Sequence, residues 1–139
     1  METFNGNIKA YFGLGVLQAL IGLGAIGGGL LLVVDPSGST LGVPSSLLEG
    51  SIFPNFLIPG IFLMVVNGFG SGIGAALSFT KSQYTQGIAI LLGVILVLWI
   101  VIQVIIIRSI GWLHGIYFFL GIIELWFGLY IRRHIVRAA

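Results

Sequence analysis

The stretch Gly121-Ile-Ile-Glu-Leu-Trp-Phe-Gly-Leu-Tyr-Ile-Arg-Arg133 places one carboxylate, Glu124, in the middle of a long apolar run that ends in arginines. A charged side chain at the centre of a bilayer costs about 2.5 to 3.5 kcal/mol on insertion scales, and more in other estimates. Such a residue persists only where protein groups face it. We therefore expect the other helices to give Glu124 a polar, protein-lined surrounding.

The composition of the whole chain agrees with a membrane setting. Of its 139 residues, 58% are hydrophobic and only 7% are charged, and the mean hydropathy is +1.15. A soluble domain has about 25% charged residues, and a water-soluble fold of this length could not bury so much apolar surface. The predicted fold class is an all-α integral membrane protein. The chain has no cysteine, which excludes disulfides, thiol catalysis and cysteine-ligated metals.

Four apolar runs are long enough to cross a bilayer, since a spanning helix needs about 20 residues. The first run is too long for the apolar core of a signal peptide, so we expect it to be retained. Turn residues follow it at Asp35-Pro-Ser-Gly38. We predict one membrane domain over residues 1–139, an antiparallel bundle of four helices. Its spans are expected at 10–34, 55–79, 87–107 and 112–131, with a structured outer loop at 35–54 that contains a helical turn near 45–48.

Three polar residues interrupt these spans at similar predicted depths. Counted from the outer end of each span at about 1.5 Å per residue, Gln18, Asn67 and Glu124 fall within roughly 6 Å of one another. Each shares a helix face with small residues, and small residues mark helix contacts in membranes. We therefore predict an intramembrane cluster of these three side chains. The glycines expected to mediate helix packing are Gly24, Gly28, Gly70, Gly74, Gly121 and Gly128.

Two interpretations of the cluster stay open. In one, Glu124 titrates or binds a cation, assisted by Asn67 and Gln18. In the other, a neutral Glu124 is hydrogen-bonded to an amide and holds helices together, as interhelical polar contacts do.

The basic residues favour one orientation, because Lys and Arg gather on the cytoplasmic side of membrane proteins. Asp35 and Glu49 fall on the opposite side, and Arg108 is an exception there. Both termini are predicted to be cytoplasmic. The C-terminal arginines are interpreted as an anchor for lipid phosphates: Arg132, Arg133 and Arg137, on the same side as Lys9 and Lys81.

Other patterns have structural explanations. Gly70-x-Gly72-x-x-Ala75 is similar to a dinucleotide-binding pattern but lies inside an apolar span, where helix packing explains it. His114 and His134 fall on opposite sides, so no metal site is expected. Neither a cofactor nor a nucleic-acid partner is predicted.

Several segments resemble a known family. The runs Gly29-Leu-Leu-Leu-Val-Val-Asp35-Pro-Ser-Gly38, Leu41-Gly-Val-Pro44 and Phe53-Pro-Asn-Phe-Leu-Ile-Pro-Gly60 are similar to a family of small four-span bacterial membrane proteins of unknown function. The positions around Gln103 and Glu124 look similar too. The resemblance implies the four-helix topology and a bacterial inner membrane, and it implies no activity. A looser likeness, through Asp35-Pro36 and Leu41 to Pro44, is to DoxX-like proteins.

The sequence predicts a non-enzymatic accessory or interaction protein, because packing signals are abundant and reactive groups are few. Its expected partners are membrane lipids and either a larger membrane complex or further copies of itself. An alternative is a small proton-coupled transporter or channel that uses Glu124. A minor alternative is a protein that binds a lipid or a quinone.

Overall fold

The computed structural model describes residues 2–108 and 110–136, and all regular structure in those ranges is helical. Two 3₁₀ turns, η1 (Ser39–Leu41) and η2 (Ser45–Leu48), lie in the long connection. The second turn confirms the helical turn predicted there. The longer elements are α1 (Glu2–Val34), α2 (Leu57–Phe62), the π-helical η3 (Leu63–Phe69), α3 (Gly70–Phe79), α4 (Thr85–Ile107), α5 (Trp112–Ile131) and the π-helical η4 (Arg132–Val136).

Four helical rods are long and apolar enough to cross a membrane, as predicted. Elements α2, η3 and α3 form one of these rods without a break. The rods pack against one another, which confirms the predicted all-α bundle of spanning helices. Their spanning portions are Asn7–Val34, Leu57–Phe79, Thr85–Ile107 and Trp112–Ile135.

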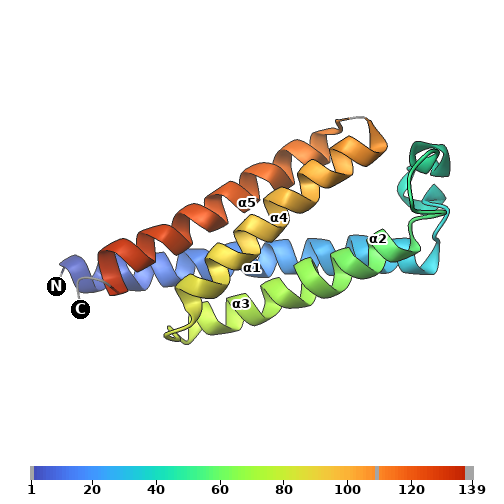
Figure 1. Ribbon diagram of the computed structural model, residues 1–139. Coiled ribbons are helices and arrows are strands. Elements are labelled where there is room, and N and C mark those ends of the chain that lie inside the picture. The colour runs from blue at the N-terminus through green and yellow to red at the C-terminus, as the bar shows by residue number, and fades with distance from the viewer. Residues whose placement is uncertain (1, 109, 137–139) are drawn as a thin grey trace.

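The bundle consists of two antiparallel hairpins. The first hairpin pairs α1 with the α2–η3–α3 rod, and the second pairs α4 with α5 along their lengths. The N- and C-terminal ends lie together at one end of the molecule (Figure 1). We call this the terminal end, and the end with the 35–56 connection the loop end. The second hairpin crosses the first at an angle, so the two diverge toward the loop end (Figure 1).

Glycines let the helices of each hairpin touch backbone to backbone. A Cβ atom on Gly93 of α4 would lie 2.8 Å from the Leu125 backbone nitrogen and 3.0 Å from the Gly121 carbonyl oxygen. In the first hairpin, a Cβ on Gly29 would lie 2.7 Å from the Gly60 carbonyl oxygen. Lipid tails are as apolar as leucine, so close packing of this kind replaces the hydrophobic effect as the force between membrane helices.

The predicted packing glycines differ in how closely they are approached. Gly24 lies against the Tyr117 hydroxyl of α5, whereas a Cβ on Gly28 would meet only Leu63, at an ordinary 3.7 Å. The closest helix approach on this part of α1 is made at Gly29 instead of at the predicted Gly24–Gly28 pair. Gly70, Gly121 and Gly128 face α4, and Gly74 faces both Gln18 of α1 and Leu92 of α4.

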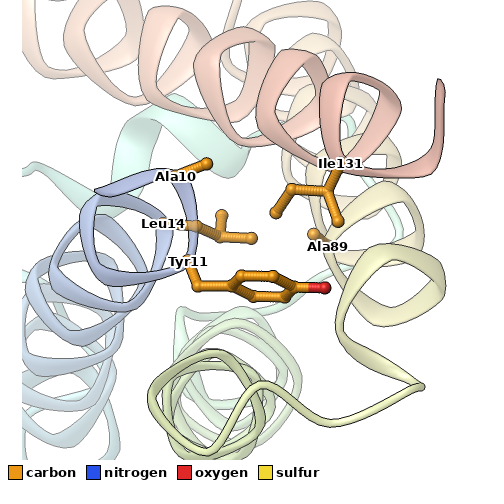
Figure 2. Close-up of a cluster of buried hydrophobic side chains, with 5 residues drawn as sticks. All are labelled: Ala10, Tyr11, Leu14, Ala89 and Ile131. Carbon is orange, nitrogen blue, oxygen red and sulfur yellow. The ribbon is translucent and has the colours of Figure 1, made fainter. Parts of the chain in front are cut away.

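The terminal end is closed by a cluster of buried apolar side chains. Three helices contribute to it, and the side chains point toward one another in the space between them (Figure 2). Burial of this cluster holds the two hairpins together near the termini. Its members are Ala10, Tyr11, Leu14, Ala89 and Ile131.

The loop end is bridged differently, by the long connection itself. Leu48 of η2 is buried against Leu32 and Phe56, and Ile106 near the end of α4 packs against this group. The connection therefore reaches from the first hairpin to the second at the loop end, where the two hairpins diverge (Figure 1).

Candidate functional site

Glu124 is completely buried, with 0% of its surface exposed. Its Oε1 atom accepts a hydrogen bond from Gln18 Nε2 at 3.1 Å. The Oε1 atom of Gln18 in turn accepts a hydrogen bond from Ser78 Oγ at 2.6 Å. Both Gln18 and Ser78 are also 0% exposed. A chain of two hydrogen bonds therefore joins α3, α1 and α5, and we call these three residues the polar chain.

A glycine makes room for the amide in the middle of the polar chain. A Cβ atom on Gly74 of α3 would lie 2.8 Å from Gln18 Nε2. Any larger residue would push the amide out of the position from which it reaches Glu124. Ser78 follows Gly74 by four residues, so the two lie on the same helix face, one turn apart.

The polar chain lies deep within the spanning rods. Gly93 packs on the Gly121–Leu125 turn that carries Glu124, so the carboxyl group is level with Gly93 of α4. Gly93 is eight residues from Thr85, where α4 begins. At 1.5 Å per residue, Glu124 is about 12 Å inside the bundle from that end. A carboxyl group at this depth has only protein groups as partners.

Asn67 does not join the polar chain. It is buried, 2% exposed, but its Nδ2 atom has no hydrogen-bond partner among the described residues. The adjacent Gly68 packs against Ile26 of α1, whereas Gln18 lies opposite Gly74. Seven residues separate Asn67 from Gly74, so Asn67 lies about 10 Å nearer the loop end than Gln18.

The expectation that all three polar groups share one level is therefore wrong for Asn67. Counting from the ends of the spans assumed rods of equal pitch that start at the same height. In the structure, Asn67 lies in the π-helical η3, which the count from the outer end of this span has to cross. A π-helical segment departs from regular α-helical geometry, so a count from residue 55 that crosses most of η3 misplaces Asn67 in depth.

Sequence reasoning missed Ser78, although a signal for it was present. Asn67, Ser71, Gly74 and Ser78 follow one another at spacings of four, three and four residues, and all four are buried. That spacing places them on one helix face. Ser78 lies one residue before the end of the predicted span 55–79, where a polar side chain alone does not indicate an interior contact.

The second carboxyl oxygen of Glu124, Oε2, is buried and has no hydrogen-bond partner in the part of the chain that the structure describes. Because Oε1 accepts from Gln18, a proton held by this carboxyl group has its place on Oε2. The arrangement can hold one proton and can tie three helices together, and Gln18 has both its amide oxygen and one amide hydrogen committed to its neighbours.

The predicted phosphate anchor is partly described. Arg132 and Arg133 are exposed on η4 at the terminal end. Arg137 lies outside the described residues. The ring of His134 lies 4.7 Å from that of Tyr130, centroid to centroid. Among the described residues, no three His, Asp or Glu side chains come together as a metal site.

Asp35 organises the start of the loop-end connection. Its Oδ1 atom accepts from Ser37 Oγ at 2.5 Å, and its Oδ2 atom accepts from the hydroxyls of Ser39 and Thr40, both at 2.7 Å. The backbone nitrogen of Thr40 adds a bond of 2.9 Å. These hydrogen bonds, that from Ser37 foremost, hold the pKa of Asp35 well below its ordinary value. The carboxylate is used to fold a turn.

Comparison with known proteins finds no match: no family model fits the chain, and no curated protein or solved structure is significantly similar to it. The fold therefore defines the class on its own. The chain is a multi-pass helical membrane protein by the length and apolar character of its rods. The resemblance to small four-span bacterial proteins stays a prediction.

The polar chain generates a stability prediction. Replacing Gln18 with Leu removes both hydrogen bonds and leaves Ser78 and Glu124 buried without partners. We expect the free energy of unfolding in detergent micelles to fall by about 1–3 kcal/mol, the cost of orphaning buried polar groups. The matched control is Gln103→Leu, since the structure shows no hydrogen bond from that glutamine side chain to a described residue. Equal losses of unfolding free energy in the two variants would show that the polar chain contributes nothing to stability.

Proposed function

We propose that this protein is a non-enzymatic interaction protein of a bacterial inner membrane, which acts as a subunit of a larger membrane complex or as a homo-oligomer. The observation that carries the proposal is the complete enclosure of Glu124 by Gln18 and its neighbours. A carboxyl group that substrate cannot reach serves the fold, because it ties α5 to α1. The groups left for function are then the apolar outer surfaces.

Those surfaces offer places where another helix can approach. Gly72 of α3 is exposed, and a Cβ atom there would meet nothing within 4 Å. Ala76 is exposed one turn further on, beside Ile73, which is 60% exposed. Small residues four apart permit close helix contact in a bilayer. This outward face of α3 is not used inside the bundle, and it supports assembly with a second spanning helix.

The charges at the two ends support cytoplasmic termini. Arg132, Arg133 and Lys9 are exposed at the terminal end. Asp35 and Glu49 belong to the loop end. By the positive-inside tendency, the terminal end faces the cytoplasm, where the arginines are positioned to contact lipid phosphates.

A proton-coupled transporter is the second candidate, and one observation favours it. The Oε2 atom of Glu124 is buried and has no hydrogen-bond partner among the described residues, and carboxyl groups inside membrane helices often belong to proton relays. Against it, the polar chain ends at Ser78 without a further described hydrogen-bond partner for its hydroxyl.

The assembly proposal is tested by native mass spectrometry of the protein released from mild detergent. We expect an oligomer or a co-purified membrane protein. Gly72→Ile should reduce that assembly several-fold, because the added side chain projects from the contact face. Gly87→Ile is the matched control, since Gly87 is also exposed with open space around it. A monomer without partners, or equal behaviour of the two variants, would contradict the proposal.

The transporter alternative has its own measurement. In liposomes with an internal pH dye, a transporter that uses Glu124 would move protons in the unmodified protein and lose that flux in Glu124→Gln. We expect no difference between the two, because the carboxyl group is enclosed and Gln keeps an acceptor for Gln18. A flux that depends on Glu124 would replace our proposal with the alternative.

A further inference from the structure

A cavity of about 540 Å³ lies where the two hairpins diverge toward the loop end. Helix α1 contributes Gly24 and Gly28 to its wall, α4 contributes Trp99, and α5 contributes Tyr117. Most of the remaining lining is aliphatic. Its volume is in the range of 300–1,000 Å³ typical of sites for small molecules. Neither Glu124 nor Gln18 lines it, so the cavity is separate from the polar chain.

The loop-end connection covers the cavity on its aqueous side. Val43, Leu48 and Phe53 of that connection line the cavity, and Leu48 is packed into the cluster that includes Ile106 of α4. On the α2 side, the ring of Phe62 stacks on Trp99 at 4.3 Å between centroids. Gly24 of α1 lies against Tyr117 of α5, whereas a Cβ atom on Gly28, one turn nearer the loop end, would meet only Leu63 of the first hairpin. A molecule would therefore reach the cavity sideways, from the lipid between α1 and α5.

The polar atoms in the wall are mainly hydrogen-bond donors. Nδ1 of His114 accepts a hydrogen bond from the Gly111 backbone nitrogen at 3.0 Å. That nitrogen carries no proton, so the ring proton is on Nε2, which is a donor. Trp99 contributes its apolar ring surface to the wall, because its indole Nε1 atom is itself buried and is not accessible from the cavity. Gln103 adds an amide that makes no hydrogen bond to a described residue.

We propose that this cavity binds a neutral, lipid-soluble molecule whose polar end carries a carbonyl oxygen, such as a quinone ring or an acyl ester. The apolar wall and lateral access select a molecule delivered by the bilayer. Donors at His114 and Gln103 select an acceptor oxygen. Charge is disfavoured because no Asp, Glu, Lys or Arg among the described residues lines the cavity. The proposal is independent of the assembly proposed above.

The test uses the full chain in a maltoside detergent that carries no ester. Native mass spectrometry would count bound decylubiquinone, dioleoylglycerol or squalene, a hydrocarbon without a carbonyl group. We expect one or both carbonyl compounds to bind at least about tenfold more tightly than squalene, a difference that two good hydrogen bonds supply. Binding of decylubiquinone without dioleoylglycerol identifies a quinone site, and binding of dioleoylglycerol without decylubiquinone identifies an acyl-ester site. Equal binding of squalene, or binding of none of the three, overturns the proposal.

A pair of adjacent variants shows whether binding occurs in this cavity. Gly28→Leu places a side chain into the cavity, whereas at Gly27 a Cβ atom meets nothing within 4 Å. Gly27→Leu is thus the control for the change in helix propensity and hydrophobicity. We expect Gly28→Leu to lose most carbonyl-ligand binding and Gly27→Leu to keep it. Equal binding in the two variants overturns the proposal.

Gln103→Leu keeps the proposal testable if Gly28→Leu fails to fold. This change retains the approximate volume and removes one donor from the wall. We expect weaker binding of the carbonyl ligand, by a few-fold, and unchanged binding of squalene. If binding of the carbonyl ligand and of squalene weakens equally, or if neither weakens, the assignment of Gln103 as a donor is overturned.

Discussion

The structure depends on the hydrogen bond from Gln18 to Glu124. In a bilayer no water can reach a buried carboxyl group, so the protein has to supply its partners. Gln18 does so with its amide nitrogen and uses its amide oxygen to accept from Ser78. One side chain thus fixes the distance between α1 and α5 and the position of α3. Because the partners come from both hairpins, the bond also sets where the hairpins meet.

Close backbone packing makes that bond possible. Gly74 leaves space for the Gln18 amide, and Gly93 brings α4 onto the turn that carries Glu124. A buried polar group stabilises the fold only when the helices around it are close enough to keep its hydrogen bonds formed. Toward the terminal end, the apolar cluster of Figure 2 continues the contact between hairpins. Toward the loop end a second buried cluster, built on Ile21, Leu96, Trp99 and Ile100, continues the contact between the hairpins. The cavity lies beside this cluster and shares three of its residues.

Much of the fold could be predicted from residue types alone. Long apolar runs specify spanning helices because backbone groups in lipid must be hydrogen-bonded within the helix. The inward direction of Glu124 followed from Gly121 and Gly128, which share its face and pack on α4. Periodicity determines such faces well, since it depends only on local helix geometry.

The features that could not be predicted depend on how far one helix is displaced along another and on the angle between the hairpins. The level of Asn67 depended on how far one rod is displaced along another and on the π-helical η3. The cavity depends on the angle between the two hairpins, which is set by side chains distant in sequence. No spacing rule relates Gly28 of α1 to His114 of α5, although both line the same cavity.

The proposed functions use parts of the structure that are separate from the enclosed carboxyl group. The enclosed carboxyl group belongs to the interior, and the exposed face of α3 and the cavity at the loop end are the parts available to other molecules. If both proposals hold, a chain with few reactive groups would still have specific sites, because shape and a small number of donors are sufficient in a lipid environment.

A double-mutant cycle on Gln18 and Glu124 tests the central claim most directly. Gln18→Leu, Glu124→Leu and the double variant would be unfolded in the same micelles, and the three losses of unfolding free energy compared. Our account predicts a favourable coupling of about 0.5–2 kcal/mol between the two residues, within the range measured for directly interacting pairs. Losses that add to within about 0.3 kcal/mol would contradict it, because residues that do not interact behave in that way.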